Sequence, residues 1–305
     1  MSCFLSQPVT SKLVRIRHGP GVVISAVSMQ NRRKTMEDEY AIETVGQITV
    51  VAVFDGHGGD SVAKVCAASL PRFLAQLPVI TVNSIKRAFV RFNDLFFGKD
   101  YTVGSTAVVS IITPDSFFVA HAGDSRAYLQ IENDPVFRLV TNPHSPARPD
   151  EKSRIELTGA IVRHGRVLGE LAVSRAFGDR RYAPAVMAEP EVVQYPRDGR
   201  PHTLVLMSDG LLERSDDYQV ITQLHQESEQ LAHLAAVNLC VWAWQHNNSA
   251  DNCAVVFVQI DGQQSLCPID RTFGIIEPVQ MHDSSIYDKA YQHDLQRYAL
   301  KWRPS

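Results

Sequence analysis

The fold-defining stretch is Ile48-Thr49-Val50-Val51-Ala52-Val53-Phe54-Asp55-Gly56-His57-Gly58-Gly59. Its first part is a nearly unbroken apolar run rich in valine, which is typical of a buried strand. The run ends abruptly at an aspartate and a cluster of glycines, residues that favour a turn. The pattern therefore predicts a buried strand that presents a carboxylate at its end.

Further elements are predicted on both sides of this strand. Apolar residues recur at helical spacing from Val62 to Leu77, and Pro78 ends that pattern. Strands are expected at residues 22–27, 106–112, 117–121, 127–131, 203–207 and 253–260, and further helices at 83–97, 149–159 and 231–244. Because helices fall between groups of strands rather than after each one, we expect an α+β fold with largely antiparallel sheets.

The composition excludes several classes of protein. With 30 basic and 33 acidic residues the net charge is −3, so we expect no nucleic-acid and no membrane partner. The five cysteines are widely spaced and form no CxxC pair, which predicts a reducing compartment, the cytoplasm or the nucleus, and no disulfide framework. No apolar run approaches the roughly 18 residues that span a bilayer. Residues 1–10 lack the apolar region of a signal peptide.

Three segments are expected along the chain. Residues 1–20 are predicted to be an irregular N-terminal extension, and residues 21–262 a single folded domain. Residues 263–305 are predicted to be a short tail with one polar helix near Ser285–Leu300.

Carboxylates at strand ends are the main chemical signal. Asp55, Asp124, Asp209 and Asp251 each adjoin an apolar strand, and Glu37-Asp38 precedes another candidate strand. If the sheets bring these ends together, like charges crowd one place, which is unfavourable unless cations neutralise them. Oxygen ligands without cysteine suit Mg²⁺ or Mn²⁺, and two such ions are a known solution for phosphoester hydrolysis. The alternative interpretation is structural, because Asp-Gly is foremost a turn dipeptide.

Seven segments in order carry a family resemblance: Arg33–Asp38, Val53–Gly59, Gly104–Ala107, Ala122–Arg126, Leu171–Asp179, Ser208–Gly210 and Asp251-Asn252. Together they resemble the metal-dependent Ser/Thr protein phosphatases of type 2C, over residues 22–260. The resemblance implies two packed antiparallel sheets flanked by helices, in a catalytic domain that is expected to be monomeric. It also implies hydrolysis of phosphoserine and phosphothreonine in protein substrates, with two Mg²⁺ or Mn²⁺ ions.

The resemblance also implies residue roles. Asp55 would bridge both ions and the Gly56 carbonyl would bind one, with Asp209 and Asp251 on the other. Glu37 would hold a metal-bound water. Arg33 would grip the substrate phosphate, for which its planar fork is suited. His57 would protonate the leaving oxygen.

Some positions depart from the family pattern. Glu213 stands where an aspartate is usual, so Asp124, Glu213 and Asp38 are only candidates for a weaker third ion or its surroundings. Asn142-Pro143-His144-Ser145 replaces the usual Asp-His-Lys-Pro, and Thr158-Gly159-Ala160 replaces a Gly-Gly turn. The segment between these positions and the next motif, the flap, is therefore expected to differ in shape and substrate preference.

Rival functions were weighed against this one. Gly56-x-Gly58-x-x-Ser61 lacks the third glycine of a dinucleotide fingerprint, and no acid follows at the expected distance. Cys66 and Arg72 have the C-x5-R spacing of cysteine-dependent phosphatases, but Cys66 falls on the apolar face of a predicted helix. The alternative that stays open is a catalytically inactive relative that binds partners. Such a relative would usually have lost a metal aspartate, whereas Asp55, Asp209 and Asp251 are all present, together with His57 and Arg33.

Overall fold

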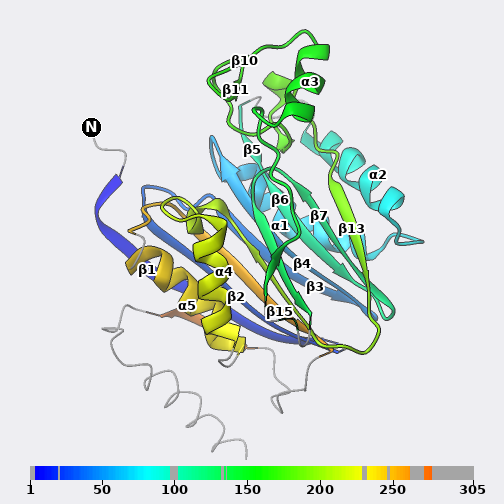
Figure 1. Cartoon of the computed structure of the whole chain (residues 1–305), viewed down its shortest axis with the longest axis vertical. Coiled ribbons are helices and arrows are strands. Elements are labelled where there is room, and N and C mark those ends of the chain that lie inside the picture. Colours follow the sequence, from blue (N-terminus) through cyan, green and yellow to red (C-terminus); the bar gives the residue numbers. More distant parts are fainter. Residues whose placement is uncertain are drawn as a thin grey trace, which may run out of the picture.

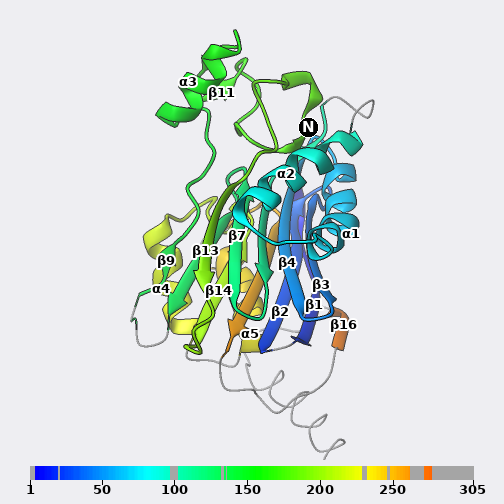
Figure 2. The same cartoon turned by 90° about the vertical axis from the view of Figure 1, so that its right-hand side faces the viewer.

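The computed structural model describes residues 4–19, 21–96, 102–131, 134, 136–228, 232–245, 248–261 and 271–276. Two seven-stranded antiparallel sheets pack against each other in the middle of the molecule, and helices cover both outer faces (Figures 1 and 2). The expected α+β class and its two-sheet sandwich are confirmed.

The first sheet has the strand order β16-β1-β2-β15-β14-β8-β9. Its strands are β1 (Phe4–Gly19), β2 (Val22–Arg33), β8 (Arg126–Ile131), β9 (Arg138–Leu139), β14 (His202–Met207), β15 (Cys253–Ile260) and β16 (Arg271–Ile276). Helices α4 (Asp217–Ser228) and α5 (Ala232–Gln245) pack on its outer face.

The second sheet has the order β12-β5-β4-β6-β7-β13, with β3 paired to β4. Its strands are β3 (Asp38–Val45), β4 (Ile48–His57), β5 (Gly104–Ser105), β6 (Ala107–Ile112), β7 (Ser116–Ala122), β12 (Phe177–Gly178) and β13 (Glu191–Pro196). Helices α1 (Ser61–Ala75) and α2 (Val82–Asn93) cover its outer face.

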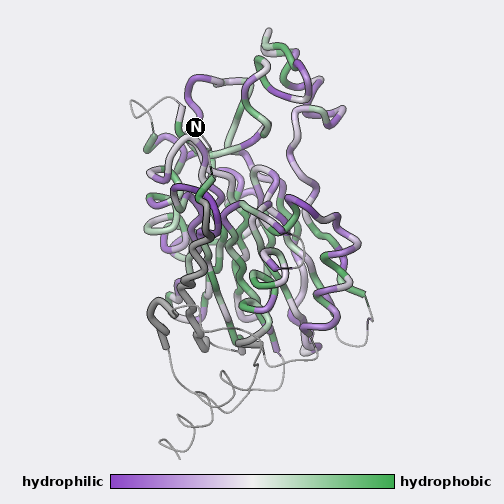
Figure 3. The backbone as a smooth tube through the Cα atoms, turned by 90° about the vertical axis from the view of Figure 1, so that its left-hand side faces the viewer, coloured by the Kyte–Doolittle hydropathy of each residue, from purple (hydrophilic) through white to green (hydrophobic). Residues whose placement is uncertain are grey.

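The apolar run of β4 serves two cores at once. Val51 and Val53 lie in the core between the sheets, whereas Val50, Ala52 and Phe54 pack against the helices outside. Successive side chains of a strand point to opposite faces, so a strand covered on both faces must be apolar throughout. Figure 3 shows this hydrophobic character along the central strands, with hydrophilic stretches in the surface loops.

The flap, residues 141–188, projects from one end of the sandwich (Figure 1, top). It contains α3 (Pro149–Leu157) and the small hairpin β10 (Val162–Arg163) and β11 (Arg166–Val167). A separate apolar cluster that includes Ile155, Val167 and Tyr182 forms its core. Short 3-10 turns occur at Asp94–Phe96, Arg180–Tyr182 and Asp209–Leu211.

Several sequence-based expectations differ from the structure. The expected irregular structure in residues 1–20 is wrong, because Phe4–Gly19 forms β1 between β2 and β16. Helix α4 and strand β13 were not predicted. In the tail, residues 271–276 form an edge strand, while the helix expected near 285–300 lies outside the described residues. Within the described part of the chain, no helix is long and apolar enough to cross a membrane.

Candidate active site

Five aspartates lie at one end of the sandwich because of the antiparallel register. Asp38 opens β3 and pairs directly with Asp55 near the end of β4. Asp209 follows β14, and Asp251 precedes β15, which pairs with the end of β14. Asp124 lies in the turn between β7 and β8, and β8 starts opposite the last residue of β14. Both sheets therefore deliver carboxylates to the same place.

Burial and neighbouring negative charge raise the pKa of Asp38, Asp55 and Asp124. Burial raises the pKa of Asp55 well above its usual value, and the charges of Asp209, Asp38 and Asp124 raise it further. Burial and then Asp209 raise the pKa of Asp124 to about 6. Burial, Asp209 and Asp251 raise that of Asp38, against a hydrogen bond from Ser208 that lowers it.

Asp209 is, after burial, the largest cause of the raised pKa of Asp55. A bound cation relieves such crowding of negative charge, and carboxylate oxygens are the ligands that Mg²⁺ and Mn²⁺ prefer. The residues present therefore fit the ions that the sequence predicts.

Hydrogen bonds fix the segments that carry these acids. The Ser208 hydroxyl donates to Asp38 Oδ2 at 2.6 Å, which ties the end of β14 to the start of β3. The backbone N–H of Glu37 donates to Asn252 Oδ1 at 2.8 Å. Gly56 is needed for close approach, because a Cβ there would lie 2.6 Å from the carbonyl oxygen of Glu37. The site is thus preorganised by the protein itself.

Arg33 lies at the edge of this cluster. Its Nε is 2.8 Å from Asp251 Oδ1, and its side chain is 46% exposed. Burial raises the pKa of Asp251, and the charge of Arg33 opposes that rise. The 2.8 Å contact to Asp251 is made by Nε and not by the two terminal nitrogens of the guanidinium. These nitrogens are the groups with which an arginine fork binds a phosphate.

Glu37 bridges two loops beside the cluster. Its Oε1 accepts a hydrogen bond from the Thr35 hydroxyl at 2.7 Å. Its Oε2 accepts one from the backbone N–H of Gly59 at 3.2 Å. The carboxylate thus ties residues 35–37 to the glycine loop after β4, and its role towards an ion stays a prediction.

Glu213 lies on the far side of Asp251. Its Oε2 accepts hydrogen bonds from the backbone N–H groups of Ala250 at 2.6 Å and Asp251 at 3.2 Å. It also accepts from the Ser249 hydroxyl at 3.1 Å. These contacts support the candidate role beside an ion rather than on it, because they hold the loop that presents Asp251.

His57 has a partner that sequence reasoning did not assign. Its Nε2 lies 2.6 Å from Oδ2 of Asp179, a side chain with no exposed surface. Burial lowers the pKa of His57, but the hydrogen bond and charge of Asp179, together with the charges of Asp124 and Glu37, raise it by more, so the net shift is upward. Asp179 ends the motif Leu171–Asp179, which was recognised without a role for its last residue.

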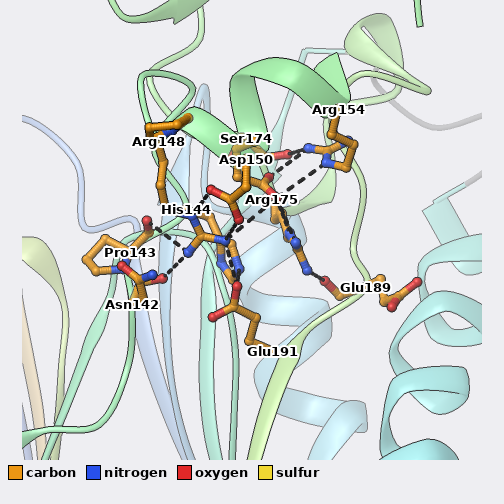
Figure 4. A network of polar contacts seen from close by, with 12 residues as sticks. Asn142, Pro143, His144, Arg148, Asp150, Arg154, Ser174, Arg175, Glu189 and Glu191 are labelled. Carbon is orange, nitrogen blue, oxygen red and sulfur yellow. Dashed lines mark hydrogen bonds and ion pairs between the residues drawn. The ribbon is translucent and has the colours of Figure 1, made fainter. Parts of the chain in front are cut away.

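An ion-pair network fixes the base of the flap (Figure 4). The carboxylate of Glu151 on α3 is 1% exposed, and it receives Arg154 Nη2 at 2.8 Å and Arg175 Nη2 at 2.6 Å. Burial raises the pKa of Glu151, but these two arginines lower it by more, so the group stays ionised. Arg148 joins α3 to β13 through Glu191 at 2.6 Å. Sequence reasoning missed this network, since Arg175 lies 24 positions from Glu151 and Glu191 lies 43 positions from Arg148.

A second group of potential metal ligands lies under the flap. Among the described residues, His121, His144 and Glu191 are the set with three ligand atoms within 4.8 Å of one another. The two rings are stacked, with centroids 4.6 Å apart and planes 25° apart, so their in-plane lone pairs do not converge on one ion. His121 Nε2 donates to the Asn142 carbonyl, and His144 Nδ1 accepts from Gly123, which leaves the proton of His144 on Nε2. The set suits hydrogen bonding towards Glu191 better than metal binding.

The sequence and the fold are both similar to those of known proteins. A family model described as "Protein phosphatase 2C" matches residues 22–253. The chain is 31% identical over 264 residues to "Probable protein phosphatase 2C 76" of Arabidopsis thaliana, covering 82% of this chain and 62% of that protein. It is also 31% identical over 299 residues to human "Protein phosphatase 1B", covering 85% and 61%.

A solved structure of a phosphatase from Toxoplasma gondii is similar with a TM-score of 0.76. It is 26% identical in sequence, and the match covers 86% of this chain and 99% of that one. The chain spans about three fifths of the length of the first curated relatives that it matches.

Proposed function

Because the chain belongs to the protein phosphatase 2C family, we propose that it hydrolyses phosphoserine and phosphothreonine in proteins with the help of divalent cations. The observation that carries the proposal is the gathering of five aspartates from both sheets around Asp55. The raised pKa values of Asp38, Asp55 and Asp124 indicate a site with more negative charge than the protein itself neutralises.

The ligands of the proposed centre come from this set. Asp55, the Gly56 carbonyl, Asp209 and Asp251 would hold two Mg²⁺ or Mn²⁺ ions, with Glu37 acting through a water molecule. Asp124, Asp38 and Glu213 would contribute to a weaker third ion or to its surroundings. Bound there, the ions would make a water molecule a stronger nucleophile and neutralise charge on the phosphate.

Arg33 supports recognition of the phosphate. Asp251 holds its Nε, so the planar guanidinium is oriented with its terminal nitrogens available for phosphate oxygens. This contact would position the phosphoryl group over the acidic cluster. Because the side chain is partly exposed, it can be reached by a phosphorylated segment of a protein substrate.

His57 supports the departure of the leaving group. A serine or threonine oxygen is a poor leaving group unless it receives a proton as the P–O bond breaks. The upward pKa shift of His57 favours a ring that carries this proton near neutral pH. We therefore assign the role of general acid to His57.

The alternative is a catalytically inactive member of the family that binds partners. Loss of a metal aspartate or of the general acid would favour it. Asp55, Asp209, Asp251, His57 and Arg33 are all present, so the arrangement favours an enzyme.

The test is phosphate release from a phosphothreonine peptide by the purified chain with millimolar MnCl₂ or MgCl₂. We expect turnover that EDTA abolishes and that Asp209→Asn lowers by at least about 100-fold, because a charged ligand of the centre is lost. Asp198→Asn removes an exposed aspartate whose ion pair among the described residues is with Arg200, and it should leave turnover unchanged. If the wild-type chain is no faster than Asp209→Asn, the binding module is the correct interpretation.

A further inference from the structure

Asp179 is a buried carboxylate whose only described hydrogen-bond partner is the imidazole of His57. Its Oδ2 lies 2.6 Å from His57 Nε2, and its Oδ1 is buried with no hydrogen-bond partner. A purely structural buried carboxylate normally has both oxygens satisfied, and an unsatisfied one costs about 1–3 kcal/mol. The described hydrogen bond of the Asp179 carboxylate is therefore made to the imidazole ring of His57.

The backbone around Asp179 is fixed on both sides. Asp179 has φ +47° and ψ +37°, a left-handed conformation that aspartate and asparagine tolerate better than most residues. The preceding Gly178 N–H donates to Asn93 Oδ1 at 2.9 Å, and Arg180 Nη2 donates to the Asn93 carbonyl at 2.6 Å. Asn93 is the last residue of α2, so this helix holds the turn that presents Asp179.

Gly104 provides the space in which the pair meets. It faces Gly178 where β5 pairs with β12. A Cβ at Gly104 would overlap both Asp179 Oδ2 and His57 Nε2. Thus α2, β5 and the turn after β12 all position one contact, although no two of these segments are adjacent in the sequence.

From this contact we propose that Asp179 is the positioning residue of His57. Its carboxylate holds the Nε2–H group in a hydrogen bond, so Nδ1 is the nitrogen that donates a proton to the leaving oxygen. A buried carboxylate on one nitrogen of a histidine sets its tautomer and orientation and stabilises the charged ring. The inference rests on the proposed function and deepens it, because it names the residue through which His57 is made a general acid.

In the proposed step, His57 gives up one proton and regains one. As water forms the new P–O bond, the electron pair of the breaking P–O bond goes to the serine or threonine oxygen. That oxygen takes the proton from His57 Nδ1, and the ring becomes neutral with Nε2–H still donating to Asp179. The proton lost by water restores the charged ring before the next turnover.

The leaving group provides the kinetic test. A phosphothreonine peptide needs the acid, whereas p-nitrophenolate leaves without a proton. For Asp179→Asn we expect kcat on the peptide to fall about 10- to 100-fold, part of the 10²–10⁴ that a general acid supplies, and kcat on p-nitrophenyl phosphate to fall less than about 3-fold. Asp198→Asn is the matched control. Equal losses on both substrates, or no loss on either, would overturn the proposal.

A double-variant cycle separates positioning from a structural role. In a His57→Ala background, Asp179→Asn should cause no further loss of peptide turnover, since residues that act as a unit are non-additive. Asn93→Ala should show the same substrate-selective loss in a weaker form. A further loss in the His57→Ala background would mean that Asp179 acts elsewhere, and the proposal would be wrong.

A spectroscopic test does not depend on activity. In the Mg²⁺ form, the short contact should give a strongly deshielded imidazole N–H proton resonance that His57→Ala and Asp179→Ala both abolish. If the signal is present but no chain shows metal-dependent turnover, the positioning contact exists and the proposed function fails. If the signal is absent from the wild-type protein while turnover is normal, the positioning role is overturned and the function stands.

Discussion

His57 and Asp179 lie 122 positions apart in the sequence and share a 2.6 Å contact. Neither residue type is unusual, and each would be tolerated at many surface positions. Their effect comes from the absence of a side chain at Gly104, which lets the imidazole and the carboxylate meet. A side chain as small as a methyl group at position 104 would therefore prevent this contact.

Substitution of Gly104 tests this geometry. Gly104→Ala would place a Cβ on top of the His57–Asp179 contact, so we expect peptide turnover to fall by about 10-fold or more and stability to fall by about 1–3 kcal/mol. Gly46→Ala is the control, because it strains a residue with φ +59° in open space far from the site. It should cost about 1 kcal/mol of stability and no activity. Equal activity of the two variants would contradict the inference that the space at Gly104 is needed for the His57–Asp179 contact.

The residues that could be predicted were those marked by strand ends. Asp55, Asp209 and Asp251 adjoin apolar runs, so the pattern pointed to one site, and the structure brings them together. Asp179 could not be found in this way. Its motif was recognised, but the motif does not say which distant histidine it meets, because that depends on how α2 and β5 pack.

Among the elements, the flap depends most on charge. Its small apolar cluster is separate from the sandwich cores, and within the flap Glu151 of α3 pairs with Arg175. Arg175 lies four residues before Asp179, the partner of His57. A change in this ion pair is therefore expected to reach the catalytic site.

Removal of Glu151 should destabilise the protein. Glu151→Ala leaves Arg154 and Arg175 without their shared carboxylate, so we expect the free energy of unfolding in urea to drop by about 3 kcal/mol. Glu156→Ala, on the same helix, removes an exposed ion pair with Lys152 and should cost less than about 1 kcal/mol. Similar losses for the two variants would mean that the network does not hold the flap.

Helices and strands were predicted correctly where the local sequence pattern determines them, and were missed where pairing with distant segments determines them. Strand β15 was expected at the residues where it is found, because its apolar run is bounded by turn residues. Strand β1 was missed, since it is ordered by β2 and β16 rather than by a pattern of its own. Helix α4 was missed because it buries few apolar side chains, such as Val220 and Leu224.

At the scale of the whole molecule, folding brings together carboxylates that the unfolded chain keeps apart. The sheets pack through apolar faces, and their strand ends meet in the acidic cluster. Without cations this crowding opposes folding, and protons relieve it. The stability of the protein should therefore depend on both pH and divalent ions.

The pH dependence has a defined sign. Asp124 has a pKa of about 6 in the folded protein against an ordinary value of 3.8, so the folded state binds more protons between these values. The raised pKa values of Asp38 and Asp55 act in the same direction. In EDTA, stability from these groups is full below about pH 4 and is lost as pH rises through 6.

Thermal unfolding measures this effect. In EDTA we expect Tm to fall between pH 5 and pH 7, by about 2–4 °C for each kcal/mol lost. Millimolar MgCl₂ at pH 7 should restore it, because bound ions stabilise the folded state by mass action. A Tm that rises across this interval in EDTA, or that ignores Mg²⁺, would contradict the charge crowding.

We propose that the strand-end carboxylates form one metal centre around Asp55. Direct measurement of Mn²⁺ binding by calorimetry on the metal-free protein tests it most closely. We predict about two tightly bound ions per chain in the wild-type protein and in the Asp198→Asn variant. The Asp55→Asn variant should lose tight binding, because it lacks the carboxylate that is proposed to hold both ions. Wild-type protein that binds no Mn²⁺, or Asp55→Asn protein that binds it as the wild type does, would contradict the account.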